Sequence, residues 1–157
     1  MNETKPDYWQ SLSPGKAAAL TVVVPSLYLL ALAIAWFAPK HFGFGFRPLI
    51  YAGLTVGLSG VVLWTVAMVH LGKSLAVLPG GERLVTHGVY KYLRHPVYLG
   101  IDMTLFGLFL AVGSMVGMIY FFVVVLLLNI VRSRLEEKAL LKKFGDAYNT
   151  YRRQTWF

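Results

Sequence analysis

The sequence predicts an all-α, polytopic membrane protein with about four transmembrane helices and a C-terminal cytoplasmic amphipathic helix. Of its 157 residues, 57% are hydrophobic and only 14% are charged, whereas a soluble domain of this size usually carries about 25% charged residues. This leaves too little polar side chain to cover a water-facing surface, but a lipid-facing surface needs none. The apolar residues also gather into long runs, and the length allows a single membrane domain over residues 1–157.

The first two predicted spans follow a polar leader at residues 1–16, which lacks the apolar core and cleavage site of a signal peptide. The first span is expected over residues 17–38, because about 22 apolar residues suffice to cross ~30 Å of hydrocarbon. The second is expected over residues 48–71. Its Gly53 and Gly57 form a Gly-x-x-x-Gly pair, which permits close approach of another helix.

The second half of the chain begins with a polar stretch, residues 72–96, which cannot cross a membrane. Two further spans are expected over 97–112 and 114–131. Only Gly113 separates them, so they form an antiparallel hairpin. The charged segment 132–157 has apolar residues at helical spacing, which predicts an amphipathic helix on the membrane surface.

The distribution of basic residues predicts the orientation. The chain has 15 Lys and Arg residues, and two of them lie in the loop between the first two spans. If both termini are in the cytoplasm, the other 13 lie on the cytoplasmic side. The positive-inside rule therefore favours cytoplasmic termini and a cytoplasmic segment 72–96. We attribute the net charge of +8 to contact with anionic lipid headgroups. Nucleic-acid binding is not expected, because it needs a basic face on a soluble fold.

Two polar residues are expected deep in the membrane. Asp102 and Asn129 lie within the third and fourth spans, where polar groups are costly and usually face protein interior or a water-filled site. In a hairpin folded about Gly113 they lie at similar heights, offset by less than ~8 Å. The absence of cysteine excludes disulfides, thiolate metal sites and a cysteine nucleophile, and no metal site is predicted.

Most of the reactive side chains fall in two segments on the predicted cytoplasmic side. Residues 88–100 combine tyrosines with Arg94 and His95, a composition that suits a planar ligand but also ordinary anchoring at a membrane boundary. Arg132 and Glu136 are spaced to form an ion pair on one helix face. Glu136 and Glu137 point in adjacent directions, so at least one is able to face a ligand.

Three sequence blocks occur in a specific order: residues 84–98, with Arg94-His95-Pro96-Val97-Tyr98; residues 134–137, with the paired glutamates; and residues 144–151. Together they resemble the isoprenylcysteine carboxyl methyltransferase and phospholipid methyltransferase superfamily of integral membrane enzymes. The resemblance covers residues 71–155. It implies S-adenosylmethionine as the methyl donor, bound outside a Rossmann fold, and the chain has no Gly-x-Gly-x-x-Gly motif.

The resemblance also implies particular site residues. The cofactor pocket would be lined by Leu84, Val85, Gly88, Tyr90, His95, Pro96, Tyr98, Glu136 and Glu137. The candidates for catalysis are Arg132, Arg134, Glu136 and Asn129. A carboxylate acceptor would need a nearby cation, which an arginine supplies, whereas an amine acceptor would need a base to take its proton.

The function implied is methyl transfer to a lipophilic or small amphiphilic acceptor, either the carboxylate of a prenylated thiol compound or a phospholipid amine. Two alternatives stay open: a sterol-reductase-like NADPH oxidoreductase, whose His-Pro-x-Tyr-x-Gly element matches residues 95–100, and a non-catalytic membrane scaffold of the same fold. Binding of S-adenosylmethionine, NADPH or neither distinguishes the three. The compact size resembles prokaryotic members, which indicates a prokaryotic cytoplasmic membrane.

Overall fold

The computed structural model describes residues 14–40, 42, 46–72 and 84–156, and for 14–20 only the backbone. Within them every named element is helical, which confirms the all-α fold; the one β-like contact is an isolated bridge between Leu93 and Trp156. The helices are α1 (Pro14–Phe37), α2 (Arg47–Leu71), the 3-10 helix η2 (Gly88–Lys91), α3 (Pro96–Val112), α4 (Met115–Tyr120), the π-helical turn η3 (Phe121–Val125), α5 (Leu126–Phe144) and α6 (Asp146–Gln154).

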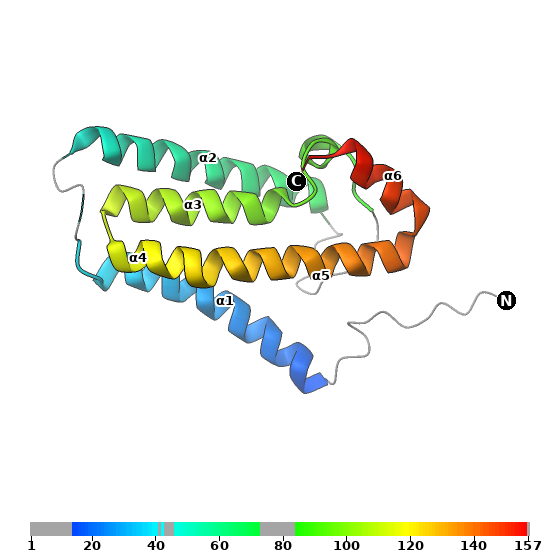
Figure 1. Ribbon diagram of the computed structural model, residues 1–157, viewed down its shortest axis with the longest axis horizontal. Helices are drawn as coiled ribbons and strands as arrows, with labels where there is room; N and C mark the ends of the chain where they lie inside the picture. The colour runs from blue at the N-terminus through cyan, green and yellow to red at the C-terminus, as the bar shows by residue number, and fades with distance from the viewer. Residues whose placement is uncertain (1–13, 41, 43–45, 73–83, 157) are drawn as a thin grey trace.

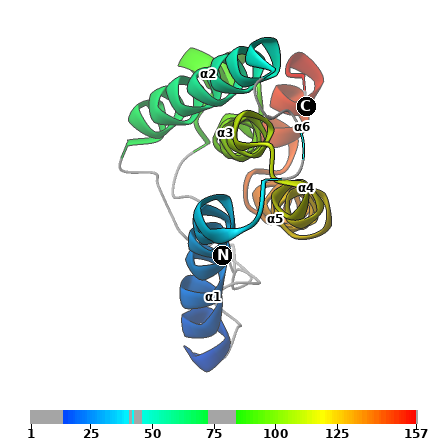
Figure 2. The ribbon, with the colours of Figure 1, turned by 90° about the vertical axis from the view of Figure 1, so that its left-hand side faces the viewer.

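The helices run mainly along one axis (Figure 1). α2, α3 and the long helix formed by α4, η3 and α5 lie roughly parallel. α1 packs against α3, α4 and η3 and then diverges from them, which is clearest in the end view (Figure 2). α6 folds back at the far end of α5, beside the loop that carries η2 (Figure 1).

Two helices are long and apolar enough to cross a membrane, namely Arg47–Leu71 and the long helix Met115–Phe144. Thr21–Phe37 and Pro96–Val112 are shorter apolar helices. Large aliphatic side chains such as Leu58 face outward on these helices, an arrangement that suits lipid rather than water. The structure is therefore consistent with a membrane protein, and the number of spans stays a prediction.

The fourth predicted span does not end where its apolar run ends. The helix continues through the expected boundary at residues 131 and 132 and stops only at Phe144. Gly145 then adopts a positive φ of 52°, and α6 begins. Charged residues continue a helix as readily as apolar ones, so the boundary of the hydrocarbon is not a boundary of the helix.

Glycines bring α2 and α3 into backbone contact. A Cβ at Gly53 would lie 2.5 Å from the amide nitrogen of Ala111, and one at Gly60 would lie 2.6 Å from the carbonyl oxygen of Gly100. On α3, a Cβ at Gly107 would strike the backbone of α2. Such close approach is typical of small-residue packing between membrane helices. We call this contact the glycine joint.

The predicted hairpin between the third and fourth apolar runs is present. α3 ends at Gly113 in the left-handed conformation (φ 73°, ψ 32°), and the Ser114 hydroxyl caps α4 by accepting from the amide of Gly117 at 3.1 Å. The carbonyl of Gly113 accepts a hydrogen bond from the amide of Phe42 at 3.2 Å. The connection between α1 and α2 is thereby attached to the same turn.

The apolar core lies where α1 crosses the hairpin. Phe109 and Val125 are fully buried there against Ala31 of α1. The Tyr120 hydroxyl donates to the carbonyl of Leu27 at 2.9 Å, which adds a polar contact between α4 and α1. The π-helical turn directly follows Tyr120, and such turns often accompany functional sites because they shift the register of the side chains beyond them.

Candidate functional site

A polar pocket of about 200 Å³ lies between α1, α2, η2, α3 and α5. Its lining residues are Tyr28, Met68, Leu71, Tyr90, Arg94, His95, Val97, Tyr98, Ile101, Arg132 and Glu136. The pocket draws on residues 90–98 and 132–136, two segments that are distant in sequence. Residues 90–98 and Glu136 belong to two of the blocks that carry the family resemblance, and Arg132 lies just before the second of them.

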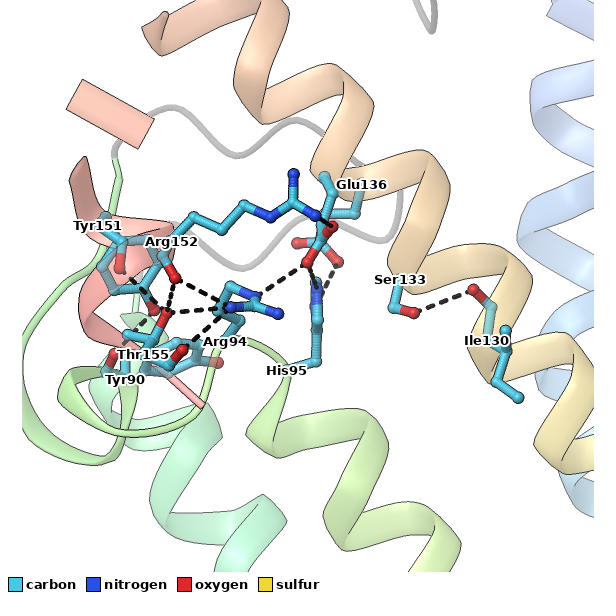
Figure 3. Close-up of polar contacts among 10 residues, drawn as sticks. Tyr90, Arg94, His95, Ile130, Ser133, Glu136, Tyr151, Arg152 and Thr155 are labelled. Carbon is cyan, nitrogen blue, oxygen red and sulfur yellow. Dashed lines mark hydrogen bonds and ion pairs between the residues drawn. The ribbon is translucent and has the colours of Figure 1, made fainter. Parts of the chain in front are cut away.

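His95 is the buried centre of this arrangement. It directly precedes Pro96, the first residue of α3, a position where a missing amide hydrogen costs nothing. Its Nε2 lies 3.4 Å from Glu137 Oε1, and its Nδ1 lies 3.8 Å from Glu136 Oε2. Figure 3 shows the imidazole pointing from α3 toward the carboxylates on α5. The ring is thus held between two acidic side chains.

Arg94 links residues 152–155 to the loop around η2, residues 84–95, which we call the η2 loop. Its Nε forms an ion pair with Glu137 Oε1 at 3.0 Å, and its Nη1 donates to the carbonyls of Arg152 and Thr155 at 3.2 and 3.1 Å (Figure 3). The amide of Trp156 also donates to the Tyr92 carbonyl at 2.8 Å. We call the group Arg94, Glu137, Arg152 and Thr155 the polar clamp.

The two adjacent glutamates have different surroundings. Glu137 contacts Arg94 and His95 through one oxygen and approaches Arg152 through the other at 3.9 Å, and it does not line the pocket. Glu136 does line the pocket, with its side chain 30% exposed, and hydrogen-bonds Tyr98. Glu137 therefore belongs to the polar clamp, whereas Glu136 is placed to meet a ligand.

Arg132 supplies a cation on the same wall. Its guanidinium lies over the Tyr98 ring, 5.4 Å from the centroid, and hydrogen-bonds the Tyr28 hydroxyl. Asn129, Arg132 and Glu136 are spaced to share one face of α5. Arg134 is exposed, about 200° further round the helix than Arg132, and does not line the pocket.

Asp102 and Asn129 meet beneath the pocket. The Asn129 amide donates to Asp102 Oδ1 at 2.7 Å, which confirms that the two residues lie at the same height in the hairpin. Asn129 is 2% exposed and does not line the pocket. Among the described residues, its contacts are therefore with other side chains of the protein rather than with the pocket.

Several residues expected to bind the cofactor do not line the pocket. Leu84 and Val85 are half-buried in the segment before η2, and Gly88 packs against the ring of His70 with a positive φ of 61°. Pro96 is buried at the start of α3. Conversely, Tyr28 was missed because α1 carries no motif, although a phenol within an apolar run is itself a signal of a polar contact.

Buried tyrosines support the η2 loop. The Tyr151 hydroxyl of α6 donates to the Tyr90 carbonyl at 2.7 Å. Burial raises the pKa of Tyr151 to about 12, against an opposing effect of the nearby Arg94. Burial also raises the pKa of Tyr90, and the Glu136 carboxylate adds to it. Both phenols are therefore neutral at physiological pH.

Comparison with known families agrees with this architecture. The model of the phospholipid methyltransferase family matches residues 49–147, from the beginning of α2 to the beginning of α6. The match covers more than half of the chain, and the protein belongs to this family of membrane methyltransferases. α1, and with it Tyr28, lies outside the matched region.

Individual relatives are isoprenylcysteine methyltransferases by name. The chain is 34% identical over 100 residues to a protein-S-isoprenylcysteine O-methyltransferase of Schizosaccharomyces pombe, covering 60% of this chain and 42% of the relative. It is 33% identical over 104 residues to protein-S-isoprenylcysteine O-methyltransferase B of Arabidopsis thaliana, covering 63% and 53% respectively. The chain thus spans about half the length of these relatives. No solved structure matches. These comparisons do not favour the reductase alternative.

Proposed function

We propose that the protein is a multi-pass membrane methyltransferase that moves a methyl group from S-adenosylmethionine to an amphiphilic acceptor, with a prenylated-thiol carboxylate as the favoured acceptor. The observation that carries the proposal is an apolar groove of about 410 Å³ adjoining the polar pocket. The two share Tyr28, Met68, Val97 and Ile101. An amphiphile fits this pair, with its head group in the pocket and its hydrocarbon in the groove.

The groove is lined by Pro25, Tyr28, Leu29, Leu32, Trp64, Met68, Val97, Ile101, Thr104 and Leu105. These residues come from α1, α2 and α3 and offer almost no polar atoms. Apolar chains partition into such a surface at about 0.8 kcal/mol per buried CH₂. With both termini in the cytoplasm, the polar pocket faces the aqueous side that supplies the cofactor, and the groove lies within the hydrocarbon.

The pocket contains groups suited to S-adenosylmethionine. A sulfonium and an amino group favour a carboxylate and aromatic faces, which Glu136, Tyr90 and Tyr98 provide. We assign direct contacts to these three and His95, while Glu137 and Pro96 maintain the shape of the pocket. The hydroxyl of Tyr148, close to the polar clamp, is buried with no hydrogen-bond partner among the described residues, but Tyr148 does not line the pocket and we assign it no ligand contact.

When bound, the cofactor supplies a methyl group on a sulfonium whose positive charge disappears as the methyl departs. The protein's contribution is to hold donor and acceptor in line. Arg132 binds an acceptor carboxylate by a charge-assisted hydrogen bond. An ammonium head group would be repelled by Arg132. This favours a carboxylate over a phospholipid amine, in agreement with the O-methyltransferase names of the relatives.

The test is calorimetric titration of the detergent-solubilised protein with S-adenosylhomocysteine, with NADPH as the control ligand. Saturable binding of S-adenosylhomocysteine, lost in His95→Ala and Glu136→Gln and kept in Arg134→Ala, is the expected result. Binding of NADPH alone would support the reductase, and binding of neither by folded protein would support the scaffold. Transfer of labelled methyl to N-acetyl-S-farnesylcysteine, but not to phosphatidylethanolamine, would then identify the acceptor class.

A further inference from the structure

A row of polar side chains connects three helices and reaches the pocket at one end. Asp102 of α3 accepts from the Asn129 amide at 2.7 Å, and the Asn129 carbonyl oxygen accepts from the Tyr28 hydroxyl of α1 at 2.5 Å. The Tyr28 hydroxyl is in turn hydrogen-bonded to Arg132. We call Asp102, Asn129, Tyr28 and Arg132 the polar chain. Neither Asp102 nor Asn129 lines the pocket, so the cofactor contacts proposed above leave both unexplained.

The hydrogen bonds of the polar chain run in one direction only, because of the groups at its two ends. A carboxylate only accepts hydrogen bonds, and a guanidinium only donates them. Asn129 places its amide nitrogen on Asp102 and so presents its carbonyl oxygen to Tyr28. Tyr28 donates its proton there and is left with oxygen lone pairs for Arg132. One donor each of Asn129, Tyr28 and Arg132 therefore meets an acceptor in a single arrangement.

This arrangement holds the Arg132 guanidinium from two sides. The Tyr28 oxygen accepts one of its hydrogens, and the face of Tyr98 lies 5.4 Å from it. An arginine side chain has many rotamers, and restricting them costs up to about 2 kcal/mol of entropy. Contacts made before the acceptor binds remove this cost from the binding step. Arg132 itself lines the pocket.

We propose that Tyr28, Asn129 and Asp102 are positioning residues that aim the Arg132 guanidinium at the anionic head group of the acceptor, so that α1 takes part in acceptor recognition. The inference rests on the proposed function and assigns these three residues a part in it. Tyr28 is the critical member, because it lines both the pocket and the groove. Acceptor kinetics then depend on α1, whereas cofactor binding does not.

The decisive variant is Tyr28→Phe, which removes one hydroxyl and keeps the ring. Methyl transfer to N-acetyl-S-farnesylcysteine should fall about ten- to hundredfold in kcat/KM, as for loss of a hydrogen bond to a charged group. The change should lie mainly in the acceptor KM. The affinity for S-adenosylhomocysteine should stay within about twofold, which also shows that the variant is folded.

The matched control is Tyr120→Phe. The Tyr120 hydroxyl also ties α1 to the hairpin, through the Leu27 carbonyl at 2.9 Å, but Tyr120 lines neither the pocket nor the groove. If the polar chain only attached α1, the two variants would have equal effects. The positioning role instead predicts near-normal kinetics for Tyr120→Phe, and equal losses in both would overturn it.

A second pair tests the far end of the polar chain. Asp102→Ala removes the acceptor of the Asn129 amide and should reproduce the effect of Tyr28→Phe, whereas Asp102→Asn keeps an oxygen for that amide and should restore most of the activity. Unchanged acceptor kinetics in both Tyr28→Phe and Asp102→Ala would overturn the positioning role while the proposed function stands. If the wild-type protein binds S-adenosylhomocysteine but does not methylate the prenylcysteine, the proposed acceptor fails first, and the inference fails with it.

Discussion

The two ends of the molecule are held together by different forces. Toward the α3–α4 hairpin, α2 and α3 meet through the glycine joint, in which Gly53 and Gly107 allow backbone to touch backbone. At the other end, the polar clamp joins α5, α6 and the η2 loop through one ion pair and several hydrogen bonds from Arg94. The first contact contains no charge, and the second depends on charge.

The two ends should therefore be destabilised by different kinds of change. A single methyl group added at Gly53, Gly60 or Gly107 disrupts the glycine joint, because no space exists for it there, but salt or pH leaves that joint unchanged. The polar clamp tolerates changes of side-chain size at its edge but responds to loss of charge. His95 and Glu136, which we assign to cofactor binding, lie beside the polar clamp. Substitutions that break the polar clamp should therefore also weaken cofactor binding.

The largest expected effect concerns the side of the membrane on which each end of the molecule lies. The chain has no cysteine, so single cysteines can be introduced without background. A cysteine at Arg153, exposed on α6, should react with a membrane-impermeant maleimide only from the cytoplasmic side, and one at Met115, exposed at the start of α4, only from the opposite side. Labelling of intact cells and of inverted vesicles provides the measurement. Reaction of both from the same side would refute the four-span arrangement.

The next effect is on the glycine joint. Gly107→Ala should lower the free energy of unfolding by roughly 3 kcal/mol, at the upper end of the range for overpacking, because its new Cβ would strike backbone atoms of α2 that have no room to move. Unfolding in mixed micelles measures this loss.

Gly57→Ala is the matched control for the glycine joint. It lies on α2 opposite Gly107, but its Cβ would have 3.5 Å to the nearest atom, the Thr104 carbonyl oxygen. It should be tolerated. Equal destabilisation by both substitutions would contradict direct backbone contact at Gly107.

A smaller loss is expected from the polar clamp. Arg94→Ala leaves Glu137 without its main partner; breaking a fully buried pair costs 3–5 kcal/mol, and partial exposure of 17% and 22% reduces this to about 2 kcal/mol. Hydrogen exchange should rise over α6 and leave the glycine joint protected. Arg134→Ala, an exposed arginine on α5, is the control and should change neither exchange nor stability. A uniform rise in exchange in Arg94→Ala would mean that the two ends are not independent.

Much of the apolar end could be predicted from sequence. The Gly-x-x-x-Gly pair predicts a close helix contact, and Gly113 predicts the hairpin, because both signals are local. The contact between Asp102 and Asn129 follows from counting residues along two helices. The partner of the glycines on α2 does not follow, since every span offers small residues. Nor does the end of the fourth helix, which has no breaker before Gly145.

The site was predictable only in part, because only some of its contacts have a local signal in the sequence. The blocks identify His95, Tyr98 and Glu136, and the fold brings them into one pocket with Arg132. The division between Glu136 and Glu137 depends on where Arg94 lies, a contact between residues 43 positions apart. Tyr28 comes from a helix outside the family match. Long-range packing decides both cases, and one sequence does not encode it as a local pattern.

The smallest effect is an alkaline dependence of the polar end. Burial raises the pKa of Tyr151 from its ordinary 10.0 to about 12, so between these values the folded state holds a proton that the unfolded state has lost. Its contribution to stability is therefore complete below pH 10 and declines as the pH rises toward 12. Thermal unfolding between pH 9 and 12 should show this decline together with tyrosinate absorbance, and Tyr151→Phe should reduce the slope by up to one proton. An unchanged slope in Tyr151→Phe would assign the alkaline sensitivity to other groups, and the absence of any decline between pH 10 and 12 would show that burial does not raise the pKa of this phenol.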